Sequence, residues 1–285
     1  MDLVLETLHK FIRQALNEDV GNGDHTSLST IPAGQQGRAK LLIKDTGIIA
    51  GVSVAQEIFK IVDPALEIEL LILDGVTVQP GDIGFYVNGS VHGILIAERL
   101  VLNTMQRMSG IATTTHNVVK LLEGTGTKVL DTRKTTPGLR YLEKLAVKIG
   151  GGVNHRFGLF DMILIKDNHV DYAGGTAKAI EAAKAYLKLK KLTIPVEIEV
   201  RNMQELNEVV NSSGVDRIML DNFTFEKLKE AVALINKRFI TEASGGITVE
   251  NVLEYAQCGV DYVSMGALTH SVRSLDMSLK AVKSN

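Results

Sequence analysis

Six short apolar segments in the second half of this chain each end in a charged or glycine-rich cluster. These segments span residues 129–134, 162–167, 196–200, 217–222, 240–246 and 262–266. Continuous apolar runs of this length are typical of strands buried on both faces. Stretches with helical spacing separate them, so the chain alternates strand and helix. This alternation predicts parallel strands in a barrel, whose catalytic groups lie at the carboxyl ends of the strands.

The first 110 residues show a different pattern. An amphipathic helix is predicted over 1–16 and a second helix over 51–62, among strand-like runs at 37–44, 47–51, 67–73 and 85–93. Turn signals such as Asp74-Gly75 and Pro80-Gly81 separate the later runs. This pattern favours an α+β module with a mostly antiparallel sheet, followed by a helix over 94–108.

The predicted fold is therefore an incomplete α/β barrel with an N-terminal α+β sandwich domain. The sandwich covers residues 1–110 and the barrel covers 111–270. We predict an incomplete barrel because the sequence clearly indicates only six strands. The alternative is that a further strand is hidden near the helix after Ile111. The C-terminal segment, 271–285, has helical spacing, and we expect a helix there that packs on the first domain.

Composition narrows the class of protein. The 285 residues carry a formal net charge of −2, which argues against a nucleic-acid-binding surface, so anion binding requires a local cluster of cations. The single cysteine, Cys258, excludes an intramolecular disulfide and is interpreted as a buried structural thiol. The start of the sequence lacks a signal-peptide pattern, and no apolar run approaches the roughly 18 residues of a membrane span. We therefore expect a cytoplasmic protein without membrane segments.

Cations follow two of the predicted strands. Arg133 and Lys134 lie in a segment with three threonines and Pro137-Gly138, and Lys166 ends an apolar run. Arginine offers a planar fork to carboxylates or phosphates, whereas lysine offers a mobile point charge. A solvated turn is the alternative for the first cluster, but its place after a buried strand favours a binding site.

A triple glycine precedes two further donors, His155 and Arg156. Glycines allow the backbone to approach a ligand closely, but such loops are also common connectors. A lone histidine is more often structural than catalytic. The neighbouring Arg156 favours a functional assignment for His155.

Two carboxylates, Glu199 and Asp221, end neighbouring predicted strands. Such a pair suits Mg²⁺, which prefers oxygen ligands, and equally suits stabilisation of a developing sugar cation. Glu197 shares the strand face of Glu199, but Glu199 lies nearer the carboxyl end and is preferred. A structural ion pair with Arg133 or Lys166 is the alternative.

Small residues end the last two predicted strands, and barrels commonly bind phosphate at this place. They are Ser244, Gly245 and Gly246 in one strand end and Gly266 in the other. The first group is expected to open into a helix capped by Thr248. Cations, two carboxylates and a phosphate loop together indicate a small, highly anionic phosphorylated substrate. We find no Ser-His-Asp order, thiol nucleophile or zinc spacing that offers another chemistry.

The ordered motifs resemble the quinolinate phosphoribosyltransferase family over essentially the full length. They include residues 18–26, 98–103, 109–113, 132–138, 150–156, 165–169, 220–222, 242–247 and 263–266. The resemblance implies a two-domain enzyme of NAD biosynthesis that joins quinolinate to 5-phosphoribosyl 1-diphosphate with Mg²⁺. The products are nicotinate mononucleotide, diphosphate and CO₂.

The resemblance also implies roles for individual residues. Arg133, His155 and Arg156 hold the quinolinate carboxylates, and Lys134 and Lys166 lie close to both substrates. Glu199 and Asp221 lie near the ribose and the metal, and Ser244, Gly245, Gly246 and Gly266 hold the 5-phosphate. Arg99 reaches into the site of a neighbouring subunit, which implies a homodimer or a hexamer built from dimers.

Two other functions remain open. A related transferase, of the kind encoded beside molybdate-transport genes, acts on a different substrate. A non-catalytic phosphate-sensing barrel keeps Ser244 to Gly246 but has no use for Glu199 and Asp221. Retention of the dicarboxylate clamp, namely Arg99, Arg133, His155 and Arg156, favours quinolinate.

Overall fold

The computed structural model describes residues 2–282, with side chains from residue 5 onward. The chain divides into two compact units, and each is discontinuous in sequence. The first contains residues 2–116, 136–151 and 271–282, and the second contains 117–135 and 152–270. The predicted boundary at residue 110 stays a prediction. No helix among the described residues has the length and apolar character to cross a membrane.

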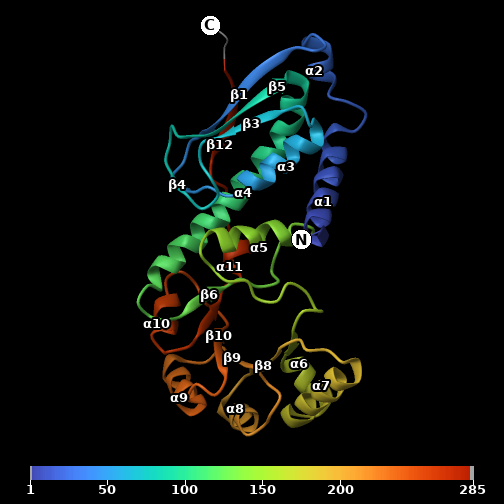
Figure 1. The fold of residues 1–285 in the computed structure, drawn as a ribbon. Helices are drawn as coiled ribbons and strands as arrows, with labels where there is room; N and C mark the ends of the chain where they lie inside the picture. The colour runs from blue at the N-terminus through green and yellow to red at the C-terminus, as the bar shows by residue number, and fades with distance from the viewer. Residues whose placement is uncertain (1, 283–285) are drawn as a thin grey trace. The chain divides into compact units, whose positions relative to one another are not determined.

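The first unit is built on a four-stranded sheet in the order β12-β1-β5-β3, in which every neighbouring pair is antiparallel (Figure 1). Its strands are β1 (Gln36–Ile43), β3 (Glu67–Leu70), β5 (Ile83–Ser90) and β12 (Met277–Ala281), beside a small ladder of β2 (Gly47–Ile48) and β4 (Thr77–Val78). Its helices are α1 (Asp2–Val20), α2 (His25–Thr30), α3 (Val52–Val62), α5 (Arg140–Ile149) and the first part of α4 (Val91–Leu121). The antiparallel sheet and the early helices confirm the predicted α+β character.

Aromatic packing joins helix and sheet in the first unit. Phe59 of α3 meets Phe85 of β5 edge to face, with ring centroids 5.9 Å apart. Both side chains are almost fully buried, as are Leu41 of β1 and Ile58 of α3. Alternate residues of β1 point into this core, which explains why the strand is apolar at every second position.

The predicted C-terminal helix is wrong, because residues 277–281 form the strand β12. Leu275, Met277 and Leu279 are buried and two residues apart, which is the period of a strand. β12 pairs with β1 from Ala39↔Ala281 to Ile43↔Met277 and thereby covers an edge of the sheet. Short apolar spacing fits either period, and the partner strand decides the outcome.

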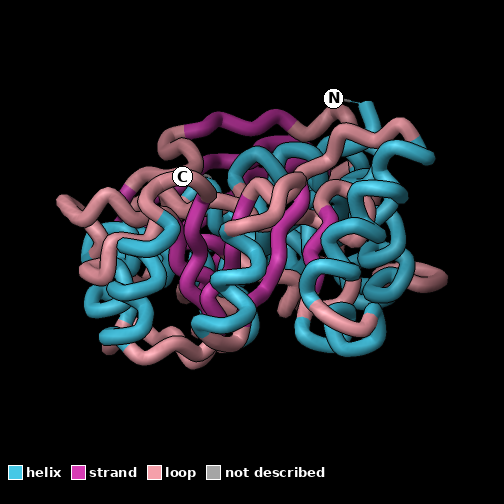
Figure 2. The backbone as a smooth tube through the Cα atoms, turned by 90° about the horizontal axis from the view of Figure 1, so that it is seen from below, coloured by secondary structure: helices cyan, strands magenta, loops and turns pink. Residues whose placement is uncertain are grey.

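The second unit contains a six-stranded parallel sheet in the order β6-β11-β10-β9-β8-β7. The strands are β6 (Lys128–Leu130), β7 (Ile163–Ile165), β8 (Val196–Val200), β9 (Arg217–Asp221), β10 (Ile240–Ser244) and β11 (Tyr262–Ser264). The helices are α6 (Asp167–Ala173), α7 (Thr176–Lys190), α8 (Met203–Val210), α9 (Phe225–Ile235), α10 (Val252–Ala256) and α11 (Ala267–His270). Figure 2 shows helices packed around the strands.

This sheet confirms the predicted incomplete barrel. All six apolar segments contain a strand, and β6 and β7 are the two ends of the strand order. The alternative of a further strand hidden near the helix after Ile111 is wrong, because α4 runs to Leu121 and the sheet of the described residues contains six strands. Val200, Ile198 and Val263 are fully buried, as expected for strands covered on both faces. Cys258 is also buried, which agrees with its assignment as a structural thiol.

Candidate active site

A cavity of about 880 Å³ lies in the second unit, where the parallel strands end. Every predicted site residue of that unit lines it, namely Arg133, Lys134, His155, Arg156, Lys166, Glu199, Asp221, Ser244, Gly245, Gly246 and Gly266. These residues come from the loop after β6, from the segment between α5 and β7, and from the ends of β7 to β11. The barrel topology therefore gathers residues that are scattered along the sequence. Arg99 is different, because it lies exposed on α4 in the first unit.

The loop that carries Arg133 and Lys134 is held by the second unit on both sides. Asp131, which is fully buried, accepts hydrogen bonds from Asn154 Nδ2 at 2.6 Å and from the His155 backbone N–H at 2.8 Å. The Lys134 carbonyl accepts a hydrogen bond from Thr269 Oγ1 at 2.9 Å. The two cations are themselves exposed at the cavity. The backbone is therefore fixed while the charged groups remain available to a ligand.

Lys166 lies between the end of β7 and the start of α6. Its backbone N–H donates to His169 Nδ1 at 2.9 Å, so His169 supports the position of Lys166 rather than facing a ligand with this nitrogen. The Lys166 ammonium lies 3.3 Å from Glu199 Oε2. The predicted alternative of an ion pair between these residues is thus found, but both partners line the cavity and are available to a bound substrate.

Glu199 and Asp221 approach the cavity from neighbouring strands. Burial raises the pKa of Glu199, the Lys166 ammonium lowers it, and the Asp221 carboxylate raises it. Asp221 accepts a hydrogen bond from Asn222 Nδ2 at 2.6 Å. Two carboxylates that repel each other at a cavity wall suit a divalent cation, because the cation removes their repulsion.

Two arginines carry positive charge at the cavity, the exposed Arg133 and the half-buried Arg156. Burial lowers the pKa of Arg156, and the charge of Arg133 lowers it further. The effect of the Arg133 charge on the pKa of Arg156 means that the two guanidinium groups repel each other. Such a pair of cations is stabilised by an anion with two negative groups.

The glycines after β10 are required by the backbone. Gly245 has φ +94°, and a Cβ there would lie 2.9 Å from the Asn222 backbone nitrogen. Gly246 has φ +62°, with nothing within 4 Å of such a Cβ. Thr248 does not cap the following helix as predicted, because α10 begins at Val252 and Asn251 is its N-cap residue. The Asn251 side chain instead accepts a hydrogen bond from the Thr248 N–H.

Gly245→Ala is expected to destabilise the protein by roughly 2–5 kcal/mol, since it adds left-handed strain to a steric clash with Asn222. Gly246→Ala, the matched control, adds strain without a clash and is expected to cost about 1 kcal/mol. The shift in thermal midpoint of each variant measures the difference. Equal shifts would contradict the steric account.

Two buried acidic residues in the same barrel were not selected by the sequence analysis, which set Glu197 aside in favour of Glu199 and did not consider Glu242. Glu197 of β8 and Glu242 of β10 are both fully buried, and Arg217 Nη1 lies 3.1 Å from Glu242 Oε2. Burial, and then repulsion by Glu197, raises the pKa of Glu242 to about 8. Burial also raises the pKa of Glu197, while Arg217 lowers it. An acidic residue inside a short strand, at the position two before Ser244, was the available signal for Glu242.

The raised pKa of Glu242 predicts a dependence of stability on pH. The folded protein retains this proton up to about pH 8, whereas the unfolded chain releases it near 4.5. The contribution to stability is therefore fully present below pH 4.5 and is lost as pH rises through 8. Glu242→Gln removes this titration, so its thermal midpoint should fall less than that of the wild type between pH 5 and pH 9. Glu208→Gln, at an exposed position of α8, serves as the control. Equal changes in thermal midpoint with pH for the wild type and Glu242→Gln would contradict the raised pKa of Glu242.

Comparison with known proteins identifies relatives over the whole chain. Residues 24–109 match the family described as quinolinate phosphoribosyl transferase, N-terminal domain, and residues 111–280 match its C-terminal domain. A mitochondrial quinolinate phosphoribosyltransferase (decarboxylating) 2b of Nicotiana tabacum is 49% identical over 96% of this chain and 82% of its own length. A probable nicotinate-nucleotide pyrophosphorylase (carboxylating) of Bacillus subtilis is 41% identical over 98% of this chain and 94% of its own length.

Solved structures give the same result. The crystal structure of NadC from Streptococcus pyogenes has a TM-score of 0.91 and 38% identity and covers 97% of both chains. A nicotinate-nucleotide pyrophosphorylase from Francisella tularensis has a TM-score of 0.90 and 38% identity and covers 97% of this chain and 96% of its own. Both domains are thus matched in sequence and in structure.

Proposed function

Because this chain belongs to the quinolinate phosphoribosyltransferase family, we propose that it transfers the phosphoribosyl group of 5-phosphoribosyl 1-diphosphate to quinolinate. Decarboxylation then gives nicotinate mononucleotide, with release of diphosphate and CO₂, as a step of NAD biosynthesis. The convergence of cations, two carboxylates and a glycine loop in one cavity carries the proposal. Quinolinate brings two carboxylates, and the second substrate brings several phosphates, so this cavity suits the charge of both.

In this proposal, Arg133, His155 and Arg156 bind the two carboxylates of quinolinate. The pyridine nitrogen attacks the anomeric carbon of the ribose, so the reaction requires no nucleophile from the protein. As the bond from this carbon to diphosphate breaks, positive charge develops on the sugar, and the carboxylates of Glu199 and Asp221 stabilise it. The new bond makes the ring nitrogen cationic. The carboxylate on the adjacent ring carbon then leaves as CO₂. The electron pair of the broken bond stays on that carbon, where the cationic nitrogen stabilises it, and a proton from water then adds to it.

The anionic groups of the second substrate have their own partners. We assign the neutralisation of the leaving diphosphate to Lys134 and Lys166, which line the cavity. The 5-phosphate is assigned to Ser244, Gly245, Gly246 and Gly266. The oxygen ligands that fit Mg²⁺ are those of Glu199 and Asp221. When bound, Mg²⁺ would supply further neutralisation of the diphosphate charge.

The proposal includes an oligomer and a location. A homodimer, or a hexamer built from three dimers, would let the exposed Arg99 reach the cavity of a neighbouring subunit. The cytoplasm is the proposed compartment, supported by the single cysteine. Plant relatives carry mitochondrial or chloroplastic names, so the proposed location differs from theirs.

The test is to incubate the purified protein with quinolinate, 5-phosphoribosyl 1-diphosphate and Mg²⁺ and to measure nicotinate mononucleotide and CO₂ together. Equal amounts of both products, abolished by a chelator, are expected. Nucleotide without CO₂ would replace quinolinate by another pyridine acid. Absence of both products would overturn the proposal in favour of a transferase for another substrate or a phosphate sensor.

A further inference from the structure

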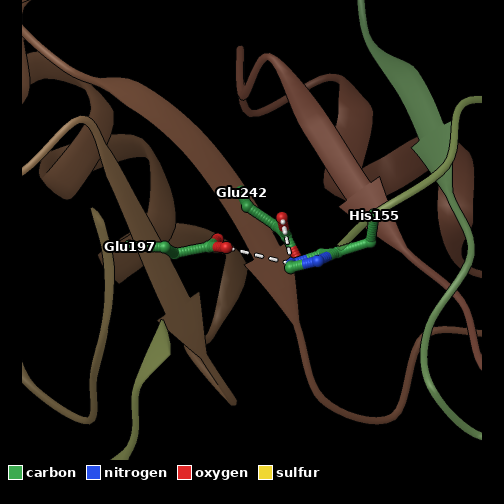
Figure 3. A group of neighbouring side chains, drawn as sticks. All are labelled: His155, Glu197 and Glu242. Atoms are coloured by element: carbon green, nitrogen blue, oxygen red, sulfur yellow. Dashed lines mark ion pairs between the residues drawn. The ribbon is translucent and has the colours of Figure 1, made fainter. Parts of the chain in front are cut away.

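Three buried side chains lie together in the second unit, and we call them the buried triad: His155, Glu197 and Glu242 (Figure 3). His155 Nε2 lies 3.0 Å from Glu197 Oε2 and 3.5 Å from Glu242 Oε2. Both carboxylates are fully buried, and the His155 side chain is 6% exposed. Burying two carboxyl groups costs free energy of folding, so we expect these two side chains to have a function that compensates for this cost.

The His155 ring has protein partners at both nitrogens. While Nε2 faces the two carboxylates, Nδ1 accepts the backbone N–H of Arg156 at 2.6 Å. The backbone N–H of His155 itself donates to the buried Asp131. The ring is therefore fixed between the carboxylates and the main chain of the next residue.

The members of the triad differ in their access to the cavity. His155 and Glu242 are among its lining residues, and so is Arg156, whereas Glu197 is not. A ligand in the cavity therefore meets His155 and Arg156, while Glu197 reaches it through the imidazole that it faces and through its electrostatic attraction to Arg156. Arg217, bound to Glu242, already supplies a positive charge to the carboxylates.

We propose that Glu197 is a positioning residue for quinolinate, which holds the His155 ring from behind and thereby fixes the backbone of Arg156, whose N–H donates to that ring. This inference rests on the proposed function. Glu242 supports the same ring from β10. Charge on Glu197 and its distance to Nε2 both matter in this arrangement.

The first test compares Glu197→Gln with wild type by steady-state kinetics. The KM for quinolinate should rise at least tenfold, because a neutral amide holds the imidazole less firmly. The KM for 5-phosphoribosyl 1-diphosphate should stay within twofold, since Ser244 to Gly246 do not depend on His155. Glu208→Gln is the matched control and should leave both constants unchanged. Equal rises in both constants would indicate a general loss of structure and overturn the proposal.

The second test is a double-mutant cycle with His155→Ala. If Glu197 acts through the imidazole, Glu197→Gln should change the quinolinate KM by less than twofold in the His155→Ala background. Independent, multiplicative effects would overturn the proposal. Should Glu197→Gln not fold, Glu197→Asp keeps the charge but withdraws it from Nε2, and its quinolinate KM should rise several-fold. An unchanged KM in that variant would also overturn it.

These tests separate the inference from the function on which it rests. Wild-type protein is assayed first for nicotinate mononucleotide. Without product, the proposed function fails before any variant is made. With product but without coupling between Glu197 and His155, the function stands and only the positioning role is lost.

Discussion

Replacing Arg133 by alanine is expected to lower kcat/KM for quinolinate by about a hundredfold or more, which corresponds to about 2.7 kcal/mol of transition-state stabilisation. The reason is that an arginine fork forms two charge-assisted hydrogen bonds to a carboxylate, and the alanine variant leaves that anion unpaired. Arg133 is exposed at the cavity, so its removal should change the thermal midpoint little. Kinetics with each substrate varied in turn would measure the effect.

Two variants sharpen this measurement. Arg133→Lys keeps the charge but loses the planar fork, and we expect it to recover only part of the activity. Arg201→Ala removes an exposed arginine of the same unit that pairs with Asp171 and Glu205, and it should retain wild-type kinetics. If Arg133→Ala kept kcat/KM within a few-fold of wild type, the carboxylate clamp would be wrong.

Lys166→Ala is expected to lower kcat about a hundredfold, with a smaller effect on the KM for quinolinate. The ammonium lies 3.3 Å from Glu199 Oε2 and lines the same cavity as Asp221. Its removal leaves two carboxylates without this cation and removes a charge that would neutralise the departing diphosphate. The pKa of Glu199, which Lys166 lowers, should rise further. Since protonation of Glu199 weakens stabilisation of the sugar cation, the acid limb of the kcat profile should move to higher pH.

The control for this variant is Lys184→Ala, because Lys184 forms an exposed pair with Glu181 on α7. Its kcat should equal that of the wild type. A Lys166→Ala enzyme with normal kcat but a raised quinolinate KM would assign Lys166 to ground-state binding instead. A pH profile identical to that of the wild type would separate Lys166 from Glu199.

The parallel sheet was predictable because its signal is local. Each of its strands is a continuous apolar run, and burial on both faces leaves few other structures for such runs. The cavity residues were predictable for the same reason: Lys166 and Asp221 directly follow or end strands, and parallel topology sends all carboxyl ends to one edge. The resemblance to a family placed Arg99 and named the substrates, neither of which follows from periodicity.

The errors come from contacts between residues far apart in sequence. Residues 277–281 form a strand because β1 offers an edge more than two hundred residues earlier, and no local pattern reports that edge. Glu197 and Glu199 share one strand face, and Glu197 was set aside because Glu199 lies nearer the carboxyl end of the strand. The two side chains differ in how deeply they are buried. The surroundings of Glu197 include His155 and Glu242, which lie on other segments of the chain. Likewise, Asn251 rather than Thr248 precedes α10, a choice made by turn geometry.

The strand β12 has a consequence for synthesis on the ribosome. The first unit is interrupted by residues 117–135 and 152–270 and receives its last strand from residues 277–281. The whole second unit therefore leaves the exit tunnel before the partner of β1 does. Until then one edge of the first sheet stays open to pairing with another nascent chain, whereas the second unit already has all its strands. Premature termination after about residue 270 would release a chain with a finished barrel and an unfinished sheet.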